Sequence, residues 1–179
     1  MFEIILEKIT PRFLVDAIRL NKKKNLLKKY QGNNVTCPIC LHNLCKFGNY
    51  GYPVRFNAFC YNCDSLERHR LMWLFITKKI GILNENKKIK LLHFSPERVL
   101  YNLFNSSPNI DYTSCDLFPQ YYNFDGKNKV EKVDITKIPY ADNTYDFIIC
   151  NHVLEHIIED RLAMSELKRI LKTGGQAIL

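Results

Sequence analysis

The stretch that most constrains the fold lies near the end of the sequence. Residues 145–150 are apolar but for one aspartate, which is typical of a parallel strand buried on both faces. Residues 160–172 predict a helix with one apolar stripe, and the glycine pair at 174–175 supplies a left-handed helix stop. An apolar run at 177–179 begins another strand. This order predicts a βαβ unit, and the polar turn at 151–152 is where open α/β sheets bind ligands.

Three earlier segments extend the predicted sheet. Residues 88–94, 111–116 and 130–135 predict its first, second and third strands. After the first strand, Ser95 makes a good N-cap and Pro96 suits the first helical position, so a helix is expected to begin there. Together these segments predict an α/β fold with a mostly parallel sheet of about five strands.

Several short motifs carry a resemblance to a known family. They are Asp134-Ile-Thr, Ile138-Pro-Tyr, Asp142-Asn-Thr-Tyr-Asp, His152-Val-Leu-Glu-His and Glu166-Leu-Lys-Arg-Ile-Leu-Lys-Thr-Gly-Gly. From about Lys88 to the end, the sequence resembles the class I S-adenosylmethionine-dependent methyltransferases, in the methyltransferase-11-like branch. The motifs are specific together, although each would be weak alone. The resemblance implies a Rossmann-like, doubly wound sheet and S-adenosylmethionine as cofactor.

The resemblance also implies which residues hold the cofactor. The expected set lies at the ends of the predicted strands: His93, Phe94, Ser95, Glu97, Asp116, Leu117, Asp134, Ile135 and Asn151. Asp134 would accept a hydrogen bond from the adenine amino group, while Ile135 packs against the ring. Asn151 and His152 would lie near the transferred methyl group and are the catalytic candidates. Glu155 and His156 are expected to form the helix entry rather than to take part in chemistry.

Asp116 can also be placed from spacing. It lies 19 residues past Glu97, close to the offset of ~20 residues at which the analogous dinucleotide-binding fold places its ribose-binding acid. A carboxylate there can accept hydrogen bonds from both ribose hydroxyls. The alternative is an aspartate that only closes the turn at the strand end.

The loop after the first strand departs from the family pattern. Methyltransferases of this class have a glycine-rich loop there, whereas this sequence has Ser95-Pro-Glu-Arg-Val. Free amides at the helix N-terminus can still face a ligand, but without glycines the backbone cannot approach it as closely. A non-catalytic domain with a vestigial cofactor crevice is therefore an alternative. The sequence also ends within the expected fifth strand, so a C-terminally truncated form of the fold is expected.

Two Cys-x-x-Cys pairs precede the sheet. Cys37-Pro-Ile-Cys40 and Cys60-Tyr-Asn-Cys63 are separated by 19 residues, a spacing typical of zinc-ribbon-like modules in which four thiolates hold one ion. His42 and Cys45 lie between the pairs and are left out of the predicted site. The alternatives are structural cysteines and a redox pair. The aromatic residues between the pairs are expected to wrap the metal hairpins rather than bind a base: Phe47, Tyr50, Tyr52, Phe56 and Phe59.

A second helix is expected directly after the second cysteine pair, with Ser65 as its N-cap. Its predicted apolar face consists of Leu66, Leu71, Leu74 and Phe75. The run Ser-Leu-Glu-Arg-His-Arg at this place resembles the N-terminal portion of some uncharacterised methyltransferases. Arg68 and Arg70 would either approach an anionic group of a ligand or lie in water.

The remaining N-terminal sequence predicts an amphipathic helix over residues 11–30, ended by Gln31-Gly-Asn-Asn. The expected domains are therefore a basic amphipathic helix over 1–34, a zinc-ribbon-like module over 35–65 and the methyltransferase core over 66–179.

Charge is distributed unevenly along the chain. Residues 1–90 contain 17 Lys and Arg against 6 Asp and Glu, and residues 91–179 contain 9 against 12. A basic front can bind nucleic acid or another anionic partner. However, the densest lysine run, at 22–29, lacks interleaved aromatic residues that stack on bases. Nucleic acid is therefore not favoured as a partner, and a solvated helix is the alternative.

The sequence also bears on location. The longest apolar run near the middle, residues 71–76, is far shorter than the ~20 residues of a membrane span. The start of the sequence carries acids inside its apolar segment, which does not fit a signal peptide. Cysteines in Cys-x-x-Cys pairs suit a reducing compartment. These features predict a cytoplasmic protein without a membrane span.

The function expected from the sequence is S-adenosylmethionine-dependent methyl transfer to an unidentified oxygen, nitrogen or carbon acceptor. Proximity and in-line orientation would supply much of the catalysis. One alternative is a non-catalytic, zinc-containing binding module. The other is an RNA-directed methyltransferase that holds phosphates on its basic front.

Overall fold

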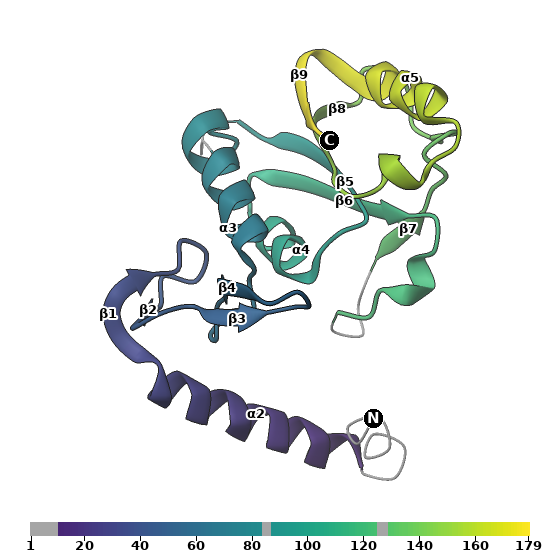
Figure 1. Ribbon diagram of the computed structural model, residues 1–179. Helices are drawn as coiled ribbons and strands as arrows, with labels where there is room; N and C mark the ends of the chain where they lie inside the picture. Colours follow the sequence, from purple (N-terminus) through teal and green to yellow (C-terminus); the bar gives the residue numbers. More distant parts are fainter. Residues whose placement is uncertain (1–10, 84–86, 125–128) are drawn as a thin grey trace. The chain divides into compact units, whose positions relative to one another are not determined.

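The computed structural model describes residues 11–83, 87–124 and 129–179 (Figure 1). The chain divides into two compact units, Met1–Phe75 and Ile76–Leu179. The predicted division of the first part into a helix over 1–34 and a metal module over 35–65 stays a prediction. The predictions that concern residues 1–10 lie outside the described residues.

The first unit consists of a long helix, two small antiparallel hairpins and a short helix. Its elements are α2 (Arg12–Lys29), β1 (Gln31–Thr36), β2 (Asn43–Leu44), β3 (Gly48–Tyr50), β4 (Arg55–Phe59) and α3 (Glu67–Leu74). β1 pairs with β2, and β3 pairs with β4. Buried Cys37, Leu44 and Cys60 form a small core between these hairpins. A π-helical turn, η1 (Phe75–Ile80), follows α3.

The leading helix forms as predicted, but most of its apolar side is exposed, including Phe13, Leu14 and Ile18. The sequence predicts that residues 31–34 end the helix, whereas they belong to β1 and the helix ends at Lys29. The Tyr30 carbonyl accepts a hydrogen bond from the Cys45 amide at 2.9 Å. Strand pairing therefore begins as soon as the helix stops.

α3 begins later than predicted. Its N-cap is Leu66 rather than Ser65. The predicted apolar face is also wrong apart from Leu66, because Leu71, Leu74 and Phe75 are exposed while His69 and Arg70 are buried.

α3 buries its polar side because of the contacts that Arg70 makes. Its guanidinium donates hydrogen bonds to the carbonyls of Asn57, Ala58 and Ser65 at 2.9–3.3 Å. It also lies 3.9 Å from the ring centroid of Phe47. Arg70 therefore holds the helix to the second cysteine loop. Its charge lies neither in water nor free toward a ligand, so both expectations for Arg70 are wrong.

The aromatic residues between the cysteine pairs have different surroundings. Phe59 is half-buried and meets Tyr61 edge-on. Phe47 packs against the cysteine core as predicted. Tyr50, Tyr52 and Phe56 are exposed, so the prediction that they wrap the metal hairpins is wrong for them. They lie on or between the short strands β3 and β4, which have too little opposing surface to cover both faces.

The second unit is a five-stranded parallel sheet with helices between its strands. The strands are β5 (Ile89–Phe94), β6 (Ile110–Asp116), β7 (Val130–Lys132), β8 (Tyr145–Cys150) and β9 (Leu171–Ile178), in the order β7-β6-β5-β8-β9. Between them lie α4 (Arg98–Asn105), α5 (Asp160–Ile170) and the short 3-10 turns η2 (Pro119–Tyr121) and η3 (Leu154–His156). The predicted α/β fold with five parallel strands is confirmed.

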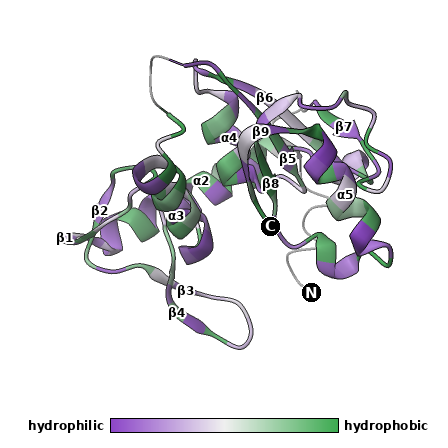
Figure 2. Ribbon diagram, turned by 90° about the horizontal axis from the view of Figure 1, so that it is seen from above, coloured by the Kyte–Doolittle hydropathy of each residue, from purple (hydrophilic) through white to green (hydrophobic). Residues whose placement is uncertain are grey.

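The central strands β5 and β8 are mostly buried, as the apolar run in β8 predicts, and Figure 2 shows β8 largely in the hydrophobic colour. Leu92 and Ile148 share one cluster with the α5 side chains Ala163, Leu167 and Ile170, so the predicted stripe of α5 is buried. On another side of β5, the His93 ring meets Phe104 of α4, with centroids 6.1 Å apart. Fully burying a side chain the size of Leu or Ile contributes about 1.5–3 kcal/mol.

Two helix boundaries differ from the prediction. Ser95 is not an N-cap, because α4 begins at Arg98 with Glu97 as its N-cap. Likewise, α5 ends at Ile170, and the glycine pair lies within β9 rather than stopping the helix. Pairing between β8 and β9 is irregular there, and Gly174 has a φ of +78°. Gly174 therefore provides the left-handed residue that an irregularity in the strand requires, not a helix cap.

A network around Arg169 fixes the loop that leads into β8. Its guanidinium donates to both carboxylate oxygens of Glu166, at 2.7 and 2.8 Å, and to Asp142 at 2.8 Å. It also donates to the carbonyls of Ile138 and Tyr140. The motif residues at these positions thus have a structural role, since they hold the loop to α5.

Candidate metal centre and cofactor edge

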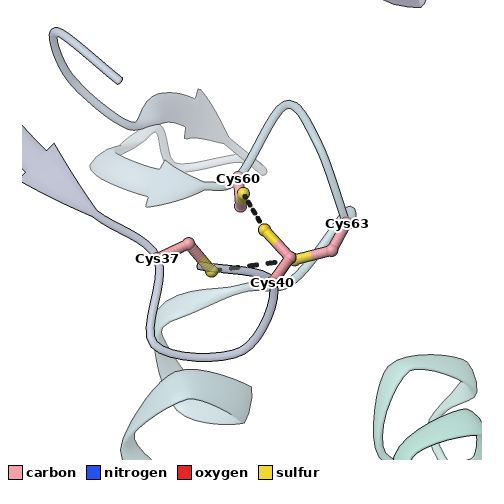
Figure 3. Close-up of side chains that lie close together, drawn as sticks. All are labelled: Cys37, Cys40, Cys60 and Cys63. Atoms are coloured by element: carbon pink, nitrogen blue, oxygen red, sulfur yellow. Dashed lines mark hydrogen bonds between the residues drawn. The ribbon is translucent and has the colours of Figure 1, made fainter. Parts of the chain in front are cut away.

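The four predicted metal ligands lie together in the first unit. The Sγ atoms of Cys37, Cys40, Cys60 and Cys63 all lie within 4.8 Å of one another (Figure 3). The Cys37–Cys63 and Cys40–Cys60 sulfur distances are 3.7 and 3.8 Å. A tetrahedral zinc ion with Zn–S bonds of about 2.3 Å would place its sulfurs about 3.8 Å apart. Among the described residues, neither His42 nor Cys45 belongs to this cluster.

Each cysteine pair is built by the same backbone turn. The Leu41 amide donates to the Cys37 carbonyl at 2.9 Å, and the Asp64 amide donates to the Cys60 carbonyl at 3.0 Å. Leu41 and Asp64 both adopt left-handed conformations, with φ of 56° and 62°. Two identical turns therefore present their sulfurs to a common centre.

The pKa shifts of the clustered thiols agree with a site that binds a cation. Hydrogen bonds from Cys60 and Cys63 hold the pKa of Cys37 far below its usual range. Its thiolate in turn raises the pKa of Cys60 to about 11 and the pKa of Cys63 still further. Without a positive ion, four sulfurs at this spacing cannot all ionise, whereas a bound divalent ion would favour four thiolates. The donor set and geometry thus fit zinc.

Sequence reasoning missed the role of Ser65. This residue is fully buried, and its Oγ lies 3.2 Å from the Cys63 sulfur and 3.6 Å from the Cys37 sulfur. The expectation of a helix cap hid this role, although its place two residues after the last cysteine of the pair was the available signal. Hydroxyls that hydrogen-bond metal-binding sulfurs orient them.

The second candidate site follows from the parallel sheet, whose strands all end at one edge. Phe94 of β5 pairs with Cys115 of β6 and Cys150 of β8. Ser95 and Asn151, just past their strands, and Asp116, the last residue of β6, therefore lie next to one another at this edge. The strand order reverses between β5 and β8, and open α/β sheets bind ligands at such a switch point.

Two non-glycine residues at this edge adopt left-handed conformations. Ser95 after β5 has a φ of 49°, and His152 after β8 has a φ of 56°. Such conformations cost energy for non-glycine residues and cluster at functional sites. Ser95 thus adopts a backbone conformation that glycine would take without cost.

Both carboxylate oxygens of Asp116 accept hydrogen bonds from residues that follow it in the sequence. Oδ1 accepts a hydrogen bond from the Phe118 amide, and Oδ2 accepts one from the Tyr122 hydroxyl, each at 2.7 Å. The same hydroxyl lies 3.0 Å from Ser95 Oγ. Burial, together with the Asp116 carboxylate, raises the pKa of Tyr122 to about 12. Tyr122 therefore links the loops after β5 and β6, a contact that the sequence does not predict.

The residues after β7 have a similar local arrangement. Asp134 is exposed, and its Oδ1 accepts hydrogen bonds from the Thr136 hydroxyl and amide, at 2.7 and 2.9 Å. These bonds lower the pKa of Asp134. Ile135 is buried in the main cluster. Asp134 can thus face a ligand, whereas Ile135 contributes mainly to the core.

His93 and Phe94 are buried core residues. His93 Nδ1 lies 3.0 Å from the Tyr112 hydroxyl, and burial lowers the pKa of His93 to about 4. Their side chains face other core residues, so only their backbone could meet a ligand at the sheet edge. Leu117, by contrast, is exposed.

The catalytic candidates lie beyond β8. Asn151 is half-buried and His152 is exposed. His152 Nδ1 lies 3.3 Å from Glu155 Oε1, and η3 carries both Glu155 and His156. A backbone hydrogen bond and the nearby histidines lower the pKa of Glu155, in spite of its exposure. His152 and Glu155 therefore form an exposed acid–base pair next to Asn151.

A cavity of about 470 Å³ lies at the opposite end of the strands. Its lining includes Lys87, Asp146, Lys172 and Gly174. Asp146 accepts hydrogen bonds there from the Lys90 amide and the Lys172 ammonium, at 3.0 and 2.9 Å. This cavity contains none of the predicted cofactor residues.

Comparisons with known proteins agree with this class of fold. Residues 98–179 match the family model described as a methyltransferase domain. An uncharacterised protein of Methanocaldococcus jannaschii is 41% identical over 46 residues, which are 26% of this chain and 20% of that protein. A demethylmenaquinone methyltransferase of Clavibacter sepedonicus is 34% identical over 56 residues, 30% of this chain and 23% of that enzyme. The chain thus spans about a fifth of the length of these curated relatives.

Solved structures of similar proteins were also found. One is a protein of Methanococcus maripaludis, provisionally identified as an S-adenosyl-L-methionine-dependent methyltransferase, with a TM-score of 0.47 and 18% identity. The match covers 60% of this chain and 52% of that one. A SAM-dependent methyltransferase of Aquifex aeolicus gives a TM-score of 0.42 and 22% identity, covering 55% and 62% of the two chains.

The open parallel sheet and its switch point define the second unit as Rossmann-like. Residues 98–179 of this unit are similar to the methyltransferase domain that the family model describes. The resemblance predicted from the sequence motifs is confirmed.

Proposed function

We propose that the protein is an S-adenosylmethionine-dependent methyltransferase that carries a structural zinc module. The main support is the switch-point edge of the sheet, which brings Ser95, Asp116 and Asn151 together within a unit matching the methyltransferase family. S-adenosylmethionine, when bound, supplies an electrophilic methyl group that an acceptor oxygen, nitrogen or carbon attacks. The acceptor itself is not identified.

The chain's own residues would bind and orient the cofactor. In the proposal, Asp116 accepts hydrogen bonds from the ribose hydroxyls and Asp134 accepts one from the adenine amino group. Ser95 and Glu97 would line the end of β5, just before α4 begins at Arg98. Leu117 and the backbone of residues 93–94 and 135 complete the binding edge.

Asn151 and His152 would act nearest to the acceptor. The His152–Glu155 contact of 3.3 Å orients the imidazole, which could then remove a proton from a hydroxyl or amine acceptor. Methyl transfer depends strongly on alignment and proximity. Substitution of His152 should therefore affect turnover more than cofactor binding.

The zinc site is proposed to be structural. Four thiolates fill all positions of a tetrahedral ion, whereas a catalytic zinc keeps one position for water or substrate. The core of the first unit is small, so metal binding should be coupled to its folding.

A second candidate function is a binding module whose crevice no longer holds cofactor. The observation that favours it is the bridge from Ser95 through the Tyr122 hydroxyl to Asp116, which occupies an acceptor otherwise offered to ribose. If this function is correct, neither cofactor nor product should bind the protein.

No helix of the described residues is long and apolar enough to cross a membrane. We propose a reducing, cytoplasmic location from cysteine usage, since two Cys-x-x-Cys pairs suit metal binding better than disulfides.

Photochemical cross-linking tests the proposed site directly. Ultraviolet irradiation with tritium-labelled S-adenosylmethionine, followed by digestion, should label peptides that contain residues 93–97, 116–122 or 134–152. Excess S-adenosylhomocysteine should suppress the label. Labelling confined to the first unit would contradict this assignment.

A further inference from the structure

The short hairpin β3–β4 of the first unit presents aromatic side chains to solvent, and Figure 2 shows it extending from the rest of that unit. Tyr52 is 100% exposed and Phe56 is 76% exposed. Tyr50 and Val54 on the same hairpin are also exposed. A tightly turned hairpin in a small module does not need these rings for its own core, so a surface of this kind indicates a binding role.

The base of this hairpin is held in place. The rings of Tyr50 and Phe59 stack with centroids 6.0 Å apart and planes 12° from parallel. The Arg55 guanidinium lies 5.7 Å from the Tyr50 centroid and pairs with Glu67 of α3. Arg70 also donates hydrogen bonds to the carbonyls of Asn57 and Ala58 in β4. The exposed rings are therefore carried on an ordered support, which lowers the entropy lost when they bind.

The unit that carries the hairpin is strongly basic. Its described residues, 11–75, contain 11 Lys and Arg against 3 Asp and Glu. The Lys29 and Lys46 ammonium groups lie 5.5 and 6.0 Å from the Tyr30 ring, which stacks on Tyr61 at 4.2 Å. A zinc ion held by four thiolates would offset this positive excess only in part. The first unit thus combines cations with exposed flat rings.

We propose that the β3–β4 hairpin and its basic unit bind single-stranded nucleic acid. A single strand offers phosphates to the lysines and exposed bases on which Tyr52 and Phe56 can stack, whereas a duplex hides its bases. The lysine run at 22–29 lacks aromatic residues, but the hairpin supplies them from a different part of the sequence. This surface does not depend on methyl transfer and extends the function proposed for the second unit.

The test measures fluorescence anisotropy of a labelled oligouridylate of about 12 nucleotides with the zinc-loaded full chain at low and moderate salt. The informative variant is Tyr52→Ser with Phe56→Ser. Its matched control is Phe13→Ser, which removes a 69% exposed ring from α2 in the same unit. A third variant, Lys24→Glu with Lys28→Glu, tests the charge contribution. Zinc content is measured for each protein to show that the module is folded.

We expect the hairpin variant to bind at least tenfold more weakly, since stacking contributes about a factor of ten or more per base. The control should stay within about twofold of the parent. The lysine variant should bind more weakly and lose less affinity as salt rises. Binding of oligothymidylate would also support the proposed single-strand site. The ratio of its affinity to that of oligouridylate measures the preference for ribose over deoxyribose.

Four results would overturn the proposal. The first is no oligonucleotide binding at low salt, and the second is a zinc-loaded hairpin variant that binds like the parent. The third is a duplex that binds as tightly as the single strand. The fourth is self-association of the parent that the hairpin substitutions abolish, which would assign the rings to a contact between two copies.

Discussion

The Tyr122 hydroxyl donates a 2.7 Å hydrogen bond to Oδ2 of Asp116, the carboxylate at the end of β6. Because that hydroxyl also lies 3.0 Å from Ser95 Oγ, it bridges the two loops between which a cofactor ribose would bind. A ribose hydroxyl that reaches Asp116 must therefore displace Tyr122 or share its acceptor. Tyr122 is thus expected to oppose cofactor binding.

Tyr122→Phe tests this competition. Removing the hydroxyl should tighten binding of S-adenosylhomocysteine by about 1 kcal/mol, roughly fivefold, because Asp116 no longer gives up an internal hydrogen bond. The dissociation constant is measured by calorimetry. Tyr121→Phe is the control, since Tyr121 is 79% exposed. Unchanged or weaker binding in Tyr122→Phe would show that the bridge does not compete with ribose.

Asp116→Ala should have the opposite effect. Loss of the carboxylate should weaken S-adenosylhomocysteine binding by about 1.5–3 kcal/mol, the usual scale for a hydrogen bond to a charged group. Asp111→Ala, at the exposed start of the same strand, should bind normally. If the folded Asp116→Ala protein binds as tightly as the parent, Asp116 does not belong to the cofactor site.

The metal site makes a separate prediction. Cys37→Ser combined with Cys60→Ser should lose zinc and disorder residues 35–65, while the sheet of the second unit keeps its circular-dichroism signal. Cys45→Ser should retain one zinc per chain, because Cys45 lies outside the cluster. Elemental analysis of protein purified without chelator gives the metal content. Near-zero zinc in the parent, with four freely reactive thiols, would contradict the site.

His93 should make the second unit sensitive to acid. Burial lowers the pKa of His93 to about 4 in the folded protein, below the ordinary value near 6.5. As pH falls through this interval the unfolded chain binds a proton first, so stability is lost between about pH 6.5 and pH 4 and is fully present above it.

This shift corresponds to about 3 kcal/mol of unfolding free energy. His93→Gln should therefore have a shallower loss of stability over that interval, measured by denaturant unfolding at several pH values. Exposed His156→Gln is the control. Parallel curves for His93→Gln and the parent would show that His93 does not carry this dependence.

The sequence predicts much of the second unit because its strands have an unambiguous pattern. The apolar run at 145–150 became β8 with its predicted bounds, and the stripe of α5 is buried as expected. The ends of helices were less predictable. Ser95 has the chemistry of a cap, but its amide donates to the Cys115 carbonyl and its backbone turns left-handed, so α4 begins later.

The cysteine cluster could be predicted from spacing alone, since four cysteines on two short turns have few other arrangements. The contacts around the two sites could not be predicted from the sequence. Arg70, Ser65 and Tyr122 each act through contacts with residues distant in sequence or through an unexpected side-chain direction. Periodicity reports which side of a helix is apolar, and α3 instead buries the side that carries Arg70.

Calorimetric titration of S-adenosylmethionine and S-adenosylhomocysteine into the zinc-loaded protein tests the central claim most directly. The account predicts binding of one ligand per chain with a dissociation constant in about the micromolar range, typical of enzyme–substrate pairs. Binding should be tighter in Tyr122→Phe and weaker in Asp116→Ala. Absence of heat and of thermal stabilisation for both ligands, in the parent and in Tyr122→Phe alike, would contradict a cofactor site at this edge of the sheet.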